Sequence, residues 1–338
     1  MKITIDRPLT MCEQGARDHQ EDAMWRAAGE MTADDRVFVV CDGMGGHEHG
    51  DVASKIASEA VGTHLTAVLD AMGTITDDDV RAAVARACEA VTDAESEPAV
   101  RHMGTTLTLL VFHRGGVTAA HVGDSRIYHL RPATGKALYW SRDHSVVMEQ
   151  WQLGNIKREQ MATAPRRNVI TRAIIAGGEP VEPDIVHITD VQPGDRFVLC
   201  TDGVTESLEH EQLLDLLSRG YSDDELLARL VNDTADNKDN HTACIVRVAA
   251  VEHEEGDDTL TGDEDSVFFN VMRVLARRTA EDAADDAGED ADAENIVVVQ
   301  PDANNVDDDD IDSDRLLRIV VAVSLTILLV LILIFLFK

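Results

Sequence analysis

Two aspartates in this chain each follow a short apolar run and precede a glycine. Residues 37–41 lead into Asp42 and a loop with three glycines, and residues 197–201 lead into Asp202 and a further glycine. A buried strand that ends on a carboxylate would hold it rigidly, and glycines let the backbone approach a ligand closely. One such element would fit either a metal site or a phosphate site. The second copy favours a metal centre.

Further carboxylates stand at the ends of other short segments, at Glu21, Asp22 and Asp239. Carboxylates together with water favour hard divalent cations such as magnesium or manganese, and no cluster of cysteine or histidine points to zinc. Two such ions close together can lower the pKa of a bridging water and neutralise charge that builds on phosphoryl oxygens. An arginine outside the metal shell can hold a phosphate through two parallel hydrogen bonds.

The elements that must position these residues can be read from apolar runs and helical periodicity. The predicted strands are residues 38–41, 106–112, 117–122, 126–130, 197–200 and 244–248. The predicted helices are residues 51–69, 78–92, 145–153, 209–217 and 223–234. The strands come in runs instead of alternating strictly with helices. This order indicates an α+β layered domain with antiparallel hairpins, and not a doubly wound parallel sheet.

Composition separates the chain into parts. The 338 residues carry a net charge of −33, and 23 acidic residues against 6 basic ones fall within residues 251–338. A nucleic-acid partner is therefore not expected, because binding would need a clustered cationic face. The five cysteines are an odd number without a CxxC pair, and the amino-terminal residues lack the apolar core of a signal peptide, which indicates a reducing cytoplasmic compartment.

The carboxyl-terminal part predicts a membrane tether. Residues 319–337 contain no charge, close to the roughly 20 apolar residues that a spanning helix needs, and two arginines just before them favour the cytoplasmic side. A buried core helix is the alternative. Residues 251–314 predict an acidic disordered linker, and residues 267–278 a short helix that docks on the domain or lies on the membrane. The predicted topology is a single-pass, tail-anchored protein of the cell membrane.

Several motifs occur together and in order. They are residues 15–22, 42–47, 104–106, 122–126, 143–145, 167–172, 201–203 and 239–242. On these motifs the chain resembles the metal-dependent protein phosphatases of the type 2C family, over about residues 5–248. The resemblance implies a four-layer α/β/β/α sandwich of two antiparallel sheets flanked by helices. It also implies a catalytic domain over residues 1–250, followed by the linker over 251–314 and the anchor over 315–338.

The resemblance also implies two magnesium or manganese ions and their ligands. Asp42 would bridge the two ions, and the Gly43 carbonyl and Glu21 would bind one of them. Asp202 and Asp239 would bind the other ion. An aspartate before a glycine is more often only a turn residue, which is the competing interpretation.

Three further roles follow from the resemblance. Asp22 would hold a metal-bound water, Arg17 would bind the substrate phosphate, and Asp124 would help to hold a third, weaker ion. The alternatives are an exposed charge for Asp22, an ordinary surface arginine for Arg17 and a turn between strands for Asp124. The Gly104–Thr106 motif is interpreted as backbone support. The histidines near the motifs, His47, His121 and His144, are interpreted as structural or hydrogen-bonding residues.

Two features bear on catalysis and partners. Met44 stands where many eukaryotic relatives carry a histidine proposed as the general acid, and methionine cannot donate a proton. A group of basic residues lies around a variable flap that residues 144–170 are expected to include; they are Arg142, Lys157, Arg158, Arg166 and Arg167. This group either contacts a phosphorylated partner or is a solvated basic face.

The sequence therefore predicts a membrane-tethered phosphatase that hydrolyses phosphoserine and phosphothreonine by a water activated between two metal ions. Its expected partners are phosphorylated proteins near the membrane, such as serine/threonine kinases or their substrates, and the lipid bilayer. The alternative is a catalytically weak pseudophosphatase that regulates a kinase or another membrane partner. Loss of Asp42, Asp202 or Asp239 would have favoured that alternative, and all three are present.

Overall fold

The computed structural model describes residues 1–45, 49–94 and 103–252. These belong to the first of two units in the chain, Met1–Thr259 and Leu260–Lys338. The predicted anchor and nearly all of the predicted linker lie outside the described residues. Among the described helices, none is both long and apolar enough to cross a membrane.

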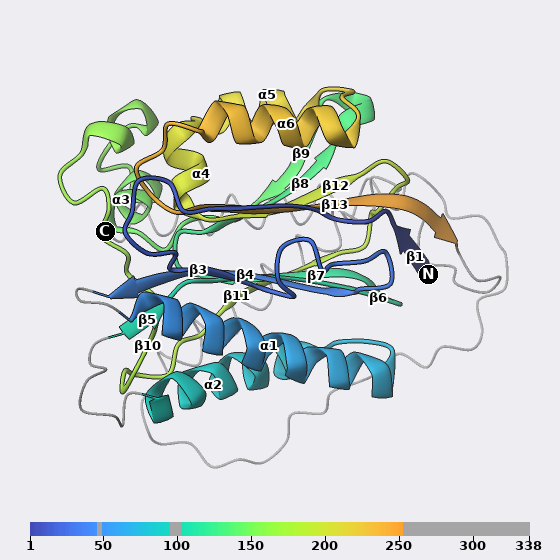
Figure 1. The fold of residues 1–338 in the computed structure, drawn as a ribbon, viewed down its shortest axis with the longest axis horizontal. Coiled ribbons are helices and arrows are strands. Elements are labelled where there is room, and N and C mark those ends of the chain that lie inside the picture. Colours follow the sequence, from blue (N-terminus) through green and yellow to red (C-terminus); the bar gives the residue numbers. More distant parts are fainter. Residues whose placement is uncertain (46–48, 95–102, 253–338) are drawn as a thin grey trace, which may run out of the picture. The chain divides into compact units, whose positions relative to one another are not determined.

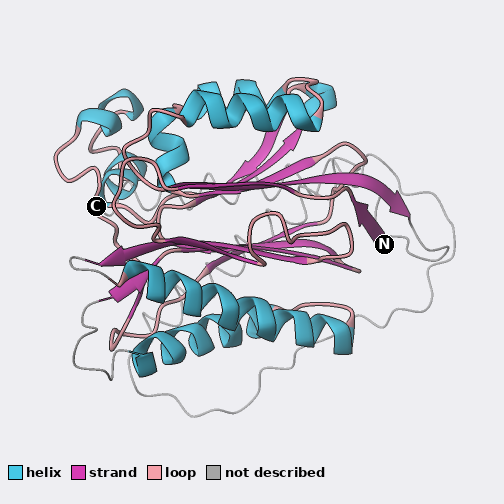
Figure 2. Cartoon of the chain, viewed as in Figure 1, coloured by secondary structure: helices cyan, strands magenta, loops and turns pink. Residues whose placement is uncertain are grey.

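Two antiparallel sheets pack face to face, and helices cover both outer faces (Figure 1 and Figure 2). The described residues thus have the α/β/β/α layers that the family resemblance implies. The seven-stranded sheet has the order β10-β5-β4-β6-β7-β11, with β3 paired to β4. Its strands are β3 (Asp22–Trp25), β4 (Val37–Gly45), β5 (Met103–Thr105), β6 (Leu107–His113), β7 (Gly116–Val122), β10 (Ile174–Ile175) and β11 (Asp184–Ile188).

The six-stranded sheet has the order β1-β13-β12-β8-β9, with β2 paired to β13. Its strands are β1 (Lys2–Ile5), β2 (Leu9–Glu13), β8 (Arg126–Arg131), β9 (Lys136–Trp140), β12 (Arg196–Cys200) and β13 (His241–Glu252). The strand β13 pairs with three neighbours and extends beyond residue 250, where we predicted the domain to end.

Helices complete the outer layers. The long α1 (Gly50–Met72) and α2 (Asp77–Ala94) pack on the seven-stranded sheet. The shorter α4 (Asp202–Ser207), α5 (His210–Ser218) and α6 (Asp223–Thr234) pack on the six-stranded sheet. Between β9 and β10 lie α3 (Val146–Gln152), which Ser145 caps through the Met148 N–H, and the 3-10 turn η2 (Arg158–Thr163). Another 3-10 turn, η1 (Pro132–Thr134), joins β8 to β9.

The central strands are buried on both faces, which explains their continuous apolar runs. In β4, Val39 and Cys41 face the α1–α2 layer, whereas Phe38 and Val40 face the other sheet. The strand β12 alternates in the same way between the space separating the sheets and the α4–α6 layer. Three apolar cores therefore hold four layers together, and the functional side chains must project from strand ends and turns at their edge.

The strands and helices predicted between residues 38 and 248 are all present, with shifted ends. One shift matters for the site. We predicted that the strand would end at Asp42. Instead β4 continues through Gly45, so Asp42 lies within the strand. The short strands β1, β2, β3, β5, β9, β10 and β11 and the short helix α4 were not predicted, because two to six residues give too little periodicity to recognise.

Candidate metal centre

Asp22 and Asp42 lie directly opposite each other on the neighbouring strands β3 and β4. Like charges in this position destabilise a sheet. Asp22 is only 6% exposed. Burial, followed by the nearby Asp202, raises the pKa of Asp22 to about 7, although the Thr201 hydroxyl donates a hydrogen bond of 2.9 Å to its Oδ2. The other carboxylate oxygen, Oδ1, is buried without a hydrogen-bond partner.

The Asp202 carboxyl group contacts that of Asp42. Asp202 is the first residue of α4, directly after β12 and Thr201. Burial raises the pKa of Asp202 to about 6, and burial together with Asp202 and Asp22 raises the pKa of Asp42 well above its usual value. Two carboxylates this close cannot both ionise easily, so without a cation the pair retains a proton.

Asp124 joins this group from the turn between β7 and β8. Burial, followed by Asp202 and Asp143, raises the pKa of Asp124 to about 7. Its Oδ1 is buried and has no hydrogen-bond partner. Asp124 therefore belongs to the same electrostatic cluster as Asp42 and Asp202.

The Gly104–Thr106 motif holds the backbone of Asp42 on both sides. The Asp42 N–H donates to Thr106 Oγ1 at 2.9 Å, and the Asp42 carbonyl accepts from the Thr106 N–H and the Thr105 hydroxyl, each at 2.9 Å. A Cβ on Gly43 would collide with the carbonyl oxygens of Gly50 and Glu21. The glycine after Asp42 is thus required by the close approach of α1 to the strand.

Glu21 and Asp239 lie at the rim of the cluster. Burial raises the pKa of Glu21, opposed by Arg17 and by a hydrogen bond from the Gly50 N–H. Arg17, whose side chain is half-exposed, forms an ion pair of 2.5 Å with Asp239. The structure thus places Arg17 between these two predicted ligands, at the edge of the cluster that faces solvent.

Two functional residues were missed by reasoning from the sequence. Asn240 is 4% exposed, and its Oδ1 accepts the Glu21 N–H at 2.7 Å while its Nδ2 donates to the carbonyls of Gln14 and His19. It therefore fixes the loop that carries Arg17 and Glu21. Thr201, which orients Asp22, is the other. Both stand beside predicted ligands, and a short polar residue next to a ligand was the available signal.

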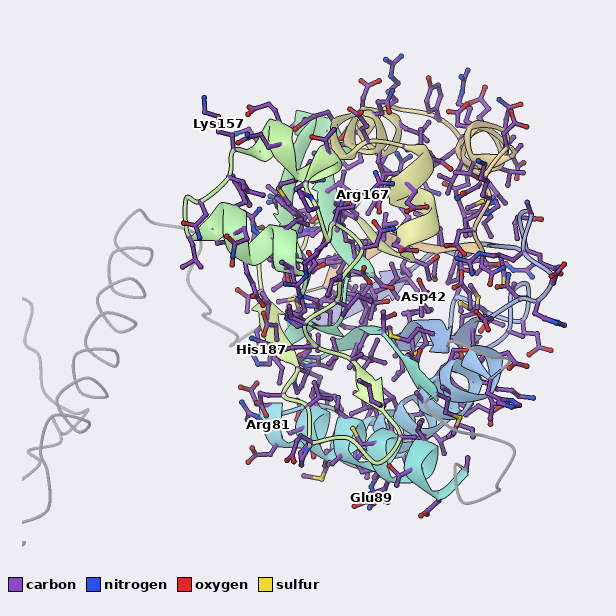
Figure 3. All side chains as sticks on the ribbon, turned by 90° about the vertical axis from the view of Figure 1, so that its left-hand side faces the viewer. Asp42, Arg81, Glu89, Lys157, Arg167 and His187 are labelled. Atoms are coloured by element: carbon purple, nitrogen blue, oxygen red, sulfur yellow. The ribbon has the colours of Figure 1, made fainter. Side chains whose placement is uncertain are left out.

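The residues present fit a divalent-cation centre. Among the described residues, no lysine or arginine forms an ion pair with Asp22, Asp42, Asp124 or Asp202. Their oxygens are hard donors, which suit magnesium and manganese, and two of these oxygens lack any partner. Figure 3 shows Asp42 at the end of the domain where these elements meet, between the outer helix layers. All eight predicted site residues are described, and they form one contiguous group.

A model of the family described as Protein phosphatase 2C matches residues 18–238. The chain belongs to the protein phosphatase 2C family. It is 32% identical over 209 residues to the serine/threonine protein phosphatase PstP of Mycobacterium tuberculosis, which covers 60% of this chain and 36% of PstP. It is 33% identical over 186 residues to the serine/threonine phosphatase stp of Listeria welshimeri, which covers 54% of this chain and 71% of that protein.

Solved structures are similar over nearly the whole described part of this phosphatase 2C domain. The crystal structure of M. tuberculosis PstP superposes with a TM-score of 0.62 at 30% identity, covering 72% of this chain and 99% of that one. The catalytic domain of PstP in complex with two manganese ions gives a TM-score of 0.60 at 29% identity, covering 73% and 100%. The matched region spans about a third of the full length of PstP.

Met44 follows Gly43 on β4 of the phosphatase 2C domain and pairs with Gly104 on β5. It is half-buried. A thioether has no proton to donate, so this position cannot supply a general acid.

The basic residues around the predicted flap are partly engaged within the domain. The Arg142 guanidinium lies 3.7 Å from the centre of the Trp140 ring and 5.3 Å from that of Trp151. Arg158 forms an ion pair of 3.0 Å with Glu211. Figure 3 labels Lys157 and Arg167 on the same segment, above Asp42. A role of this group in binding a phosphorylated partner stays a prediction.

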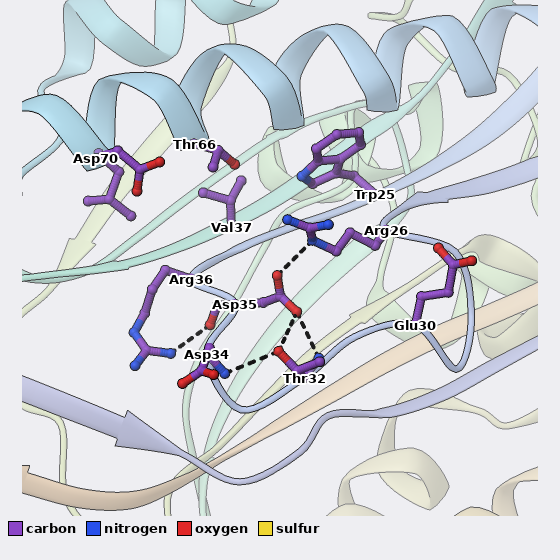
Figure 4. Close-up of a pocket in the computed structure, with 11 residues that line it drawn as sticks. Trp25, Arg26, Glu30, Thr32, Asp34, Asp35, Arg36, Val37, Thr66 and Asp70 are labelled. Atoms are coloured by element: carbon purple, nitrogen blue, oxygen red, sulfur yellow. Dashed lines mark hydrogen bonds and ion pairs between the residues drawn. The ribbon is translucent and has the colours of Figure 1, made fainter.

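A separate cavity of about 400 Å³ lies beside α1, away from the carboxylate cluster. Figure 4 shows that Trp25, Thr66 and the Arg26–Asp35 ion pair line it. This pair has a distance of 2.7 Å, so its charges are already matched. No predicted site residue borders the cavity, and we assign the functional site of the phosphatase 2C domain to the carboxylates.

Proposed function

We propose that residues 1–250 form a metal-dependent phosphatase that hydrolyses phosphoserine and phosphothreonine on proteins. The observation that carries the proposal is the cluster of Asp22, Asp42, Asp124 and Asp202, whose pKa values are all raised and with which no lysine or arginine of the described residues forms an ion pair. Buried like charges are costly, and such clusters mark functional sites when they lie in a cleft or at an edge. The naming of relatives as serine/threonine phosphatases supports the substrate class.

In this proposal, two magnesium or manganese ions would be held, with Asp42 as a ligand of both. Glu21 and the Gly43 carbonyl would hold one ion, and Asp202 and Asp239 would hold the other. When bound, such ions lower the pKa of water and neutralise charge on phosphoryl oxygens. The protein contributes rigid donors: the backbone of Asp42 is fixed by three hydrogen bonds, and Asp202 is fixed by the start of α4.

Arg17 positions the phosphate. Its guanidinium carries several donors and is half-exposed, and only one of its nitrogens pairs with Asp239. The remaining donors can therefore meet a phosphate through parallel hydrogen bonds. Because Met44 has no proton to give, the proton for the departing serine or threonine oxygen comes from water.

The test is hydrolysis of para-nitrophenyl phosphate and of a phosphothreonine peptide by the full-length protein, titrated with manganese. We expect manganese-dependent activity on both substrates and loss of that activity in Asp42→Ala. Asp215→Ala, which removes an exposed acid on α5, is the matched control and should retain activity. Absence of activity in the wild type, or full activity in Asp42→Ala, would overturn the proposal. Manganese binding without activity would support the pseudophosphatase alternative.

We further propose that residues 315–338 tether the domain to the membrane and direct it to phosphorylated proteins nearby, such as kinases or their substrates. The sequence supports this, because residues 319–337 are uncharged and apolar. Deleting residues 315–338 should release the protein from membrane pellets and leave hydrolysis of para-nitrophenyl phosphate unchanged. A truncated protein that still pellets would show that the anchor is wrongly assigned.

A further inference from the structure

One residue outside the carboxylate cluster holds the turn that carries Asp124. The backbone N–H of His144 donates to the Gly123 carbonyl at 2.9 Å, and the backbone N–H of Gly123 donates to the ring nitrogen Nδ1 of His144 at 3.1 Å. Both backbone polar groups of Gly123 are therefore bonded to a single residue. Gly123 directly precedes Asp124, so this pair of bonds sets the path of the backbone into the predicted ligand.

Contacts of both ring nitrogens fix the orientation of the His144 side chain. Because Nδ1 accepts the Gly123 N–H, the neutral ring carries its proton on Nε2, which lies 3.2 Å from Asp184 Oδ2. Arg172 donates to the other oxygen of Asp184 at 2.8 Å. The His121 ring stacks on His144 with 4.5 Å between ring centres. Burial, followed by His121, lowers the pKa of His144 to about 4, so the ring is uncharged at neutral pH.

The same residues do not form a second metal site. His121, His144 and Asp184 have potential ligand atoms within 4.8 Å of one another. A metal would need a lone pair from each ring. His121 has one on Nδ1, because its Nε2 lies 2.7 Å from the Arg142 carbonyl and must donate there. His144 has none left, since one nitrogen accepts from Gly123 and the other carries the proton that faces Asp184.

The turn has little freedom on its opposite side. Gly123 has a φ of +103°, and a Cβ there would lie 2.6 Å from Thr106 Cγ2. The hydroxyl of Thr106 also lies 2.7 Å from that of Ser125. One carboxylate oxygen of Asp124, Oδ1, is buried without a hydrogen-bond partner, so no hydrogen bond fixes that oxygen. Its direction depends on the backbone, which is held between Thr106 and His144.

We propose that His144 is a positioning residue for the cation held by Asp124, acting through its two hydrogen bonds to Gly123. This inference rests on the proposed function and on the role that the family resemblance implies for Asp124, which is to help to hold a third, weaker ion. His144 also stands at the base of the segment containing α3 and η2, because its carbonyl accepts the Thr171 N–H at 2.7 Å. It thereby connects that segment to the Asp124 turn.

Two substitutions separate the two halves of the imidazole. In His144→Asn, the amide oxygen replaces Nδ1 and can still accept the Gly123 N–H, but the contact with Asp184 is lost. In His144→Gln, the amide nitrogen replaces Nε2 and can still reach Asp184, but the acceptor for Gly123 is lost. The control is His129→Gln, because His129 is an equally buried histidine that stacks on Phe197 and pairs with Asp195, away from the cluster.

The measurement is manganese binding to the full-length protein, followed by the electron paramagnetic resonance signal of free manganese, with urea unfolding of each variant as a check on folding. Comparing Asp124→Asn with the wild type shows which of the manganese affinities depends on Asp124. We expect His144→Gln to weaken that affinity by about 10- to 100-fold, as loss of an outer-shell partner typically does. His144→Asn should stay within about threefold of the wild type, and His129→Gln should leave all manganese affinities unchanged even where it lowers stability.

Each outcome has a distinct meaning. If the wild type binds no manganese, the proposed function fails. If manganese binds but Asp124→Asn changes no affinity, or if His144→Gln leaves the Asp124-dependent affinity intact, the inference about His144 is wrong while the proposed function stands. Equal weakening in His144→Asn and His144→Gln would also overturn it, because a general loss of packing would then explain the effect. Should His144→Gln fail to fold, Asp184→Asn takes its place, with a smaller weakening expected.

Discussion

A buried aspartate, Asp195, directly precedes the strand β12, and a partly buried one, Asp202, follows it closely; their surroundings are opposite in kind. At the first end, Asp195 accepts hydrogen bonds from His129 Nε2 at 2.9 Å, from two nitrogens of Arg131 at 2.9 and 3.0 Å, and from the Gln192 N–H at 2.9 Å. Burial alone would raise its pKa, but the hydrogen bonds from His129 and Arg131 lower the pKa of Asp195 to about 2.

At the other end of β12, Asp202 has carboxylates for neighbours. Burial raises the pKa of Asp202 to about 6, and Asp239 adds to the rise. The two aspartates flank the same strand, Asp195 fully buried and Asp202 partly buried. Their pKa values move apart because the protein supplies cationic and neutral donors at one end and further acids at the other. The charge of Asp195 is balanced by donors of the protein itself. We expect the charge of Asp202 and its acidic neighbours to be balanced by a bound cation.

The largest effect that this comparison predicts is for Asp202→Asn. Loss of a carboxylate that binds metal directly should lower kcat/KM for a phosphopeptide by more than the ~100-fold typical of outer-shell changes. In the metal-free protein the same substitution should raise the urea midpoint, since it removes repulsion with Asp42. Steady-state kinetics with manganese and urea unfolding with EDTA measure the two effects. Lower stability in EDTA would contradict the view that Asp202 is destabilising without a cation.

The next largest effect is expected at the opposite end of β12. Asp195→Asn leaves Arg131 with a weaker partner in a buried pair, which should cost about 3 kcal/mol of unfolding free energy. The affinity for manganese and the kcat of the folded protein should not change, because Asp195 takes no part in the carboxylate cluster. Urea unfolding and manganese titration of this variant, beside Asp202→Asn, test the contrast directly. A loss of manganese affinity in Asp195→Asn would break it.

The sequence predicts the role of Asp202 at one end of β12 but not that of Asp195 at the other. Asp202 is recognisable because it stands in a motif, after an apolar run and before a glycine. Asp195 stands in an ordinary turn, and its partners His129 and Arg131 are more than 60 residues away in the sequence. Such a pairing depends on the register between β8 and β12, which apolar patterns do not specify.

The same limit applies within the metal centre. Residue types and order are enough to predict the ligands, the layers and the longer helices and strands. They do not reveal that Asp22 lies opposite Asp42, since that depends on the pairing of β3, a strand too short to recognise. They also do not reveal that both nitrogens of His144 are committed to hydrogen bonds, because Gly123 approaches it from the turn after β7 and Asp184 from β11.

The pH dependence of stability should differ in sign between the two kinds of aspartate. In the metal-free domain, Asp22, Asp124 and Asp202 keep protons up to about pH 6–7, whereas the unfolded chain releases them near pH 4. The native state then binds more protons between these values, so stability falls as pH rises from 4 to 7. We expect a loss of at least about 1.4 kcal/mol, the equivalent of one pKa unit on one group.

Manganese should remove this loss at pH 7 and have little effect at pH 5, where protons compete for the same oxygens. Asp195 acts in the other direction, because its lowered pKa stabilises the fold above about pH 4 and this contribution disappears as pH falls toward 2. Urea unfolding from pH 2 to 8, with EDTA or with manganese, gives both curves. Stability that rises with pH in EDTA would show that the cluster is compensated without metal.

The smallest expected effect concerns two arginines, Arg131 beside Asp195 and Arg17 at the rim of the carboxylate cluster. Arg131 is held by Asp190 and Asp195 through several bonds and its side chain is 13% exposed, whereas Arg17 has a single bond to Asp239 and is 52% exposed. Arg17 is therefore free to meet a substrate, and Arg131 is not. Arg17→Lys keeps the charge but loses the planar pair of donors, so KM for a phosphopeptide should rise about fivefold with kcat nearly constant. Arg7→Lys, a surface change, is the control, and an unchanged KM in Arg17→Lys would remove Arg17 from the substrate site.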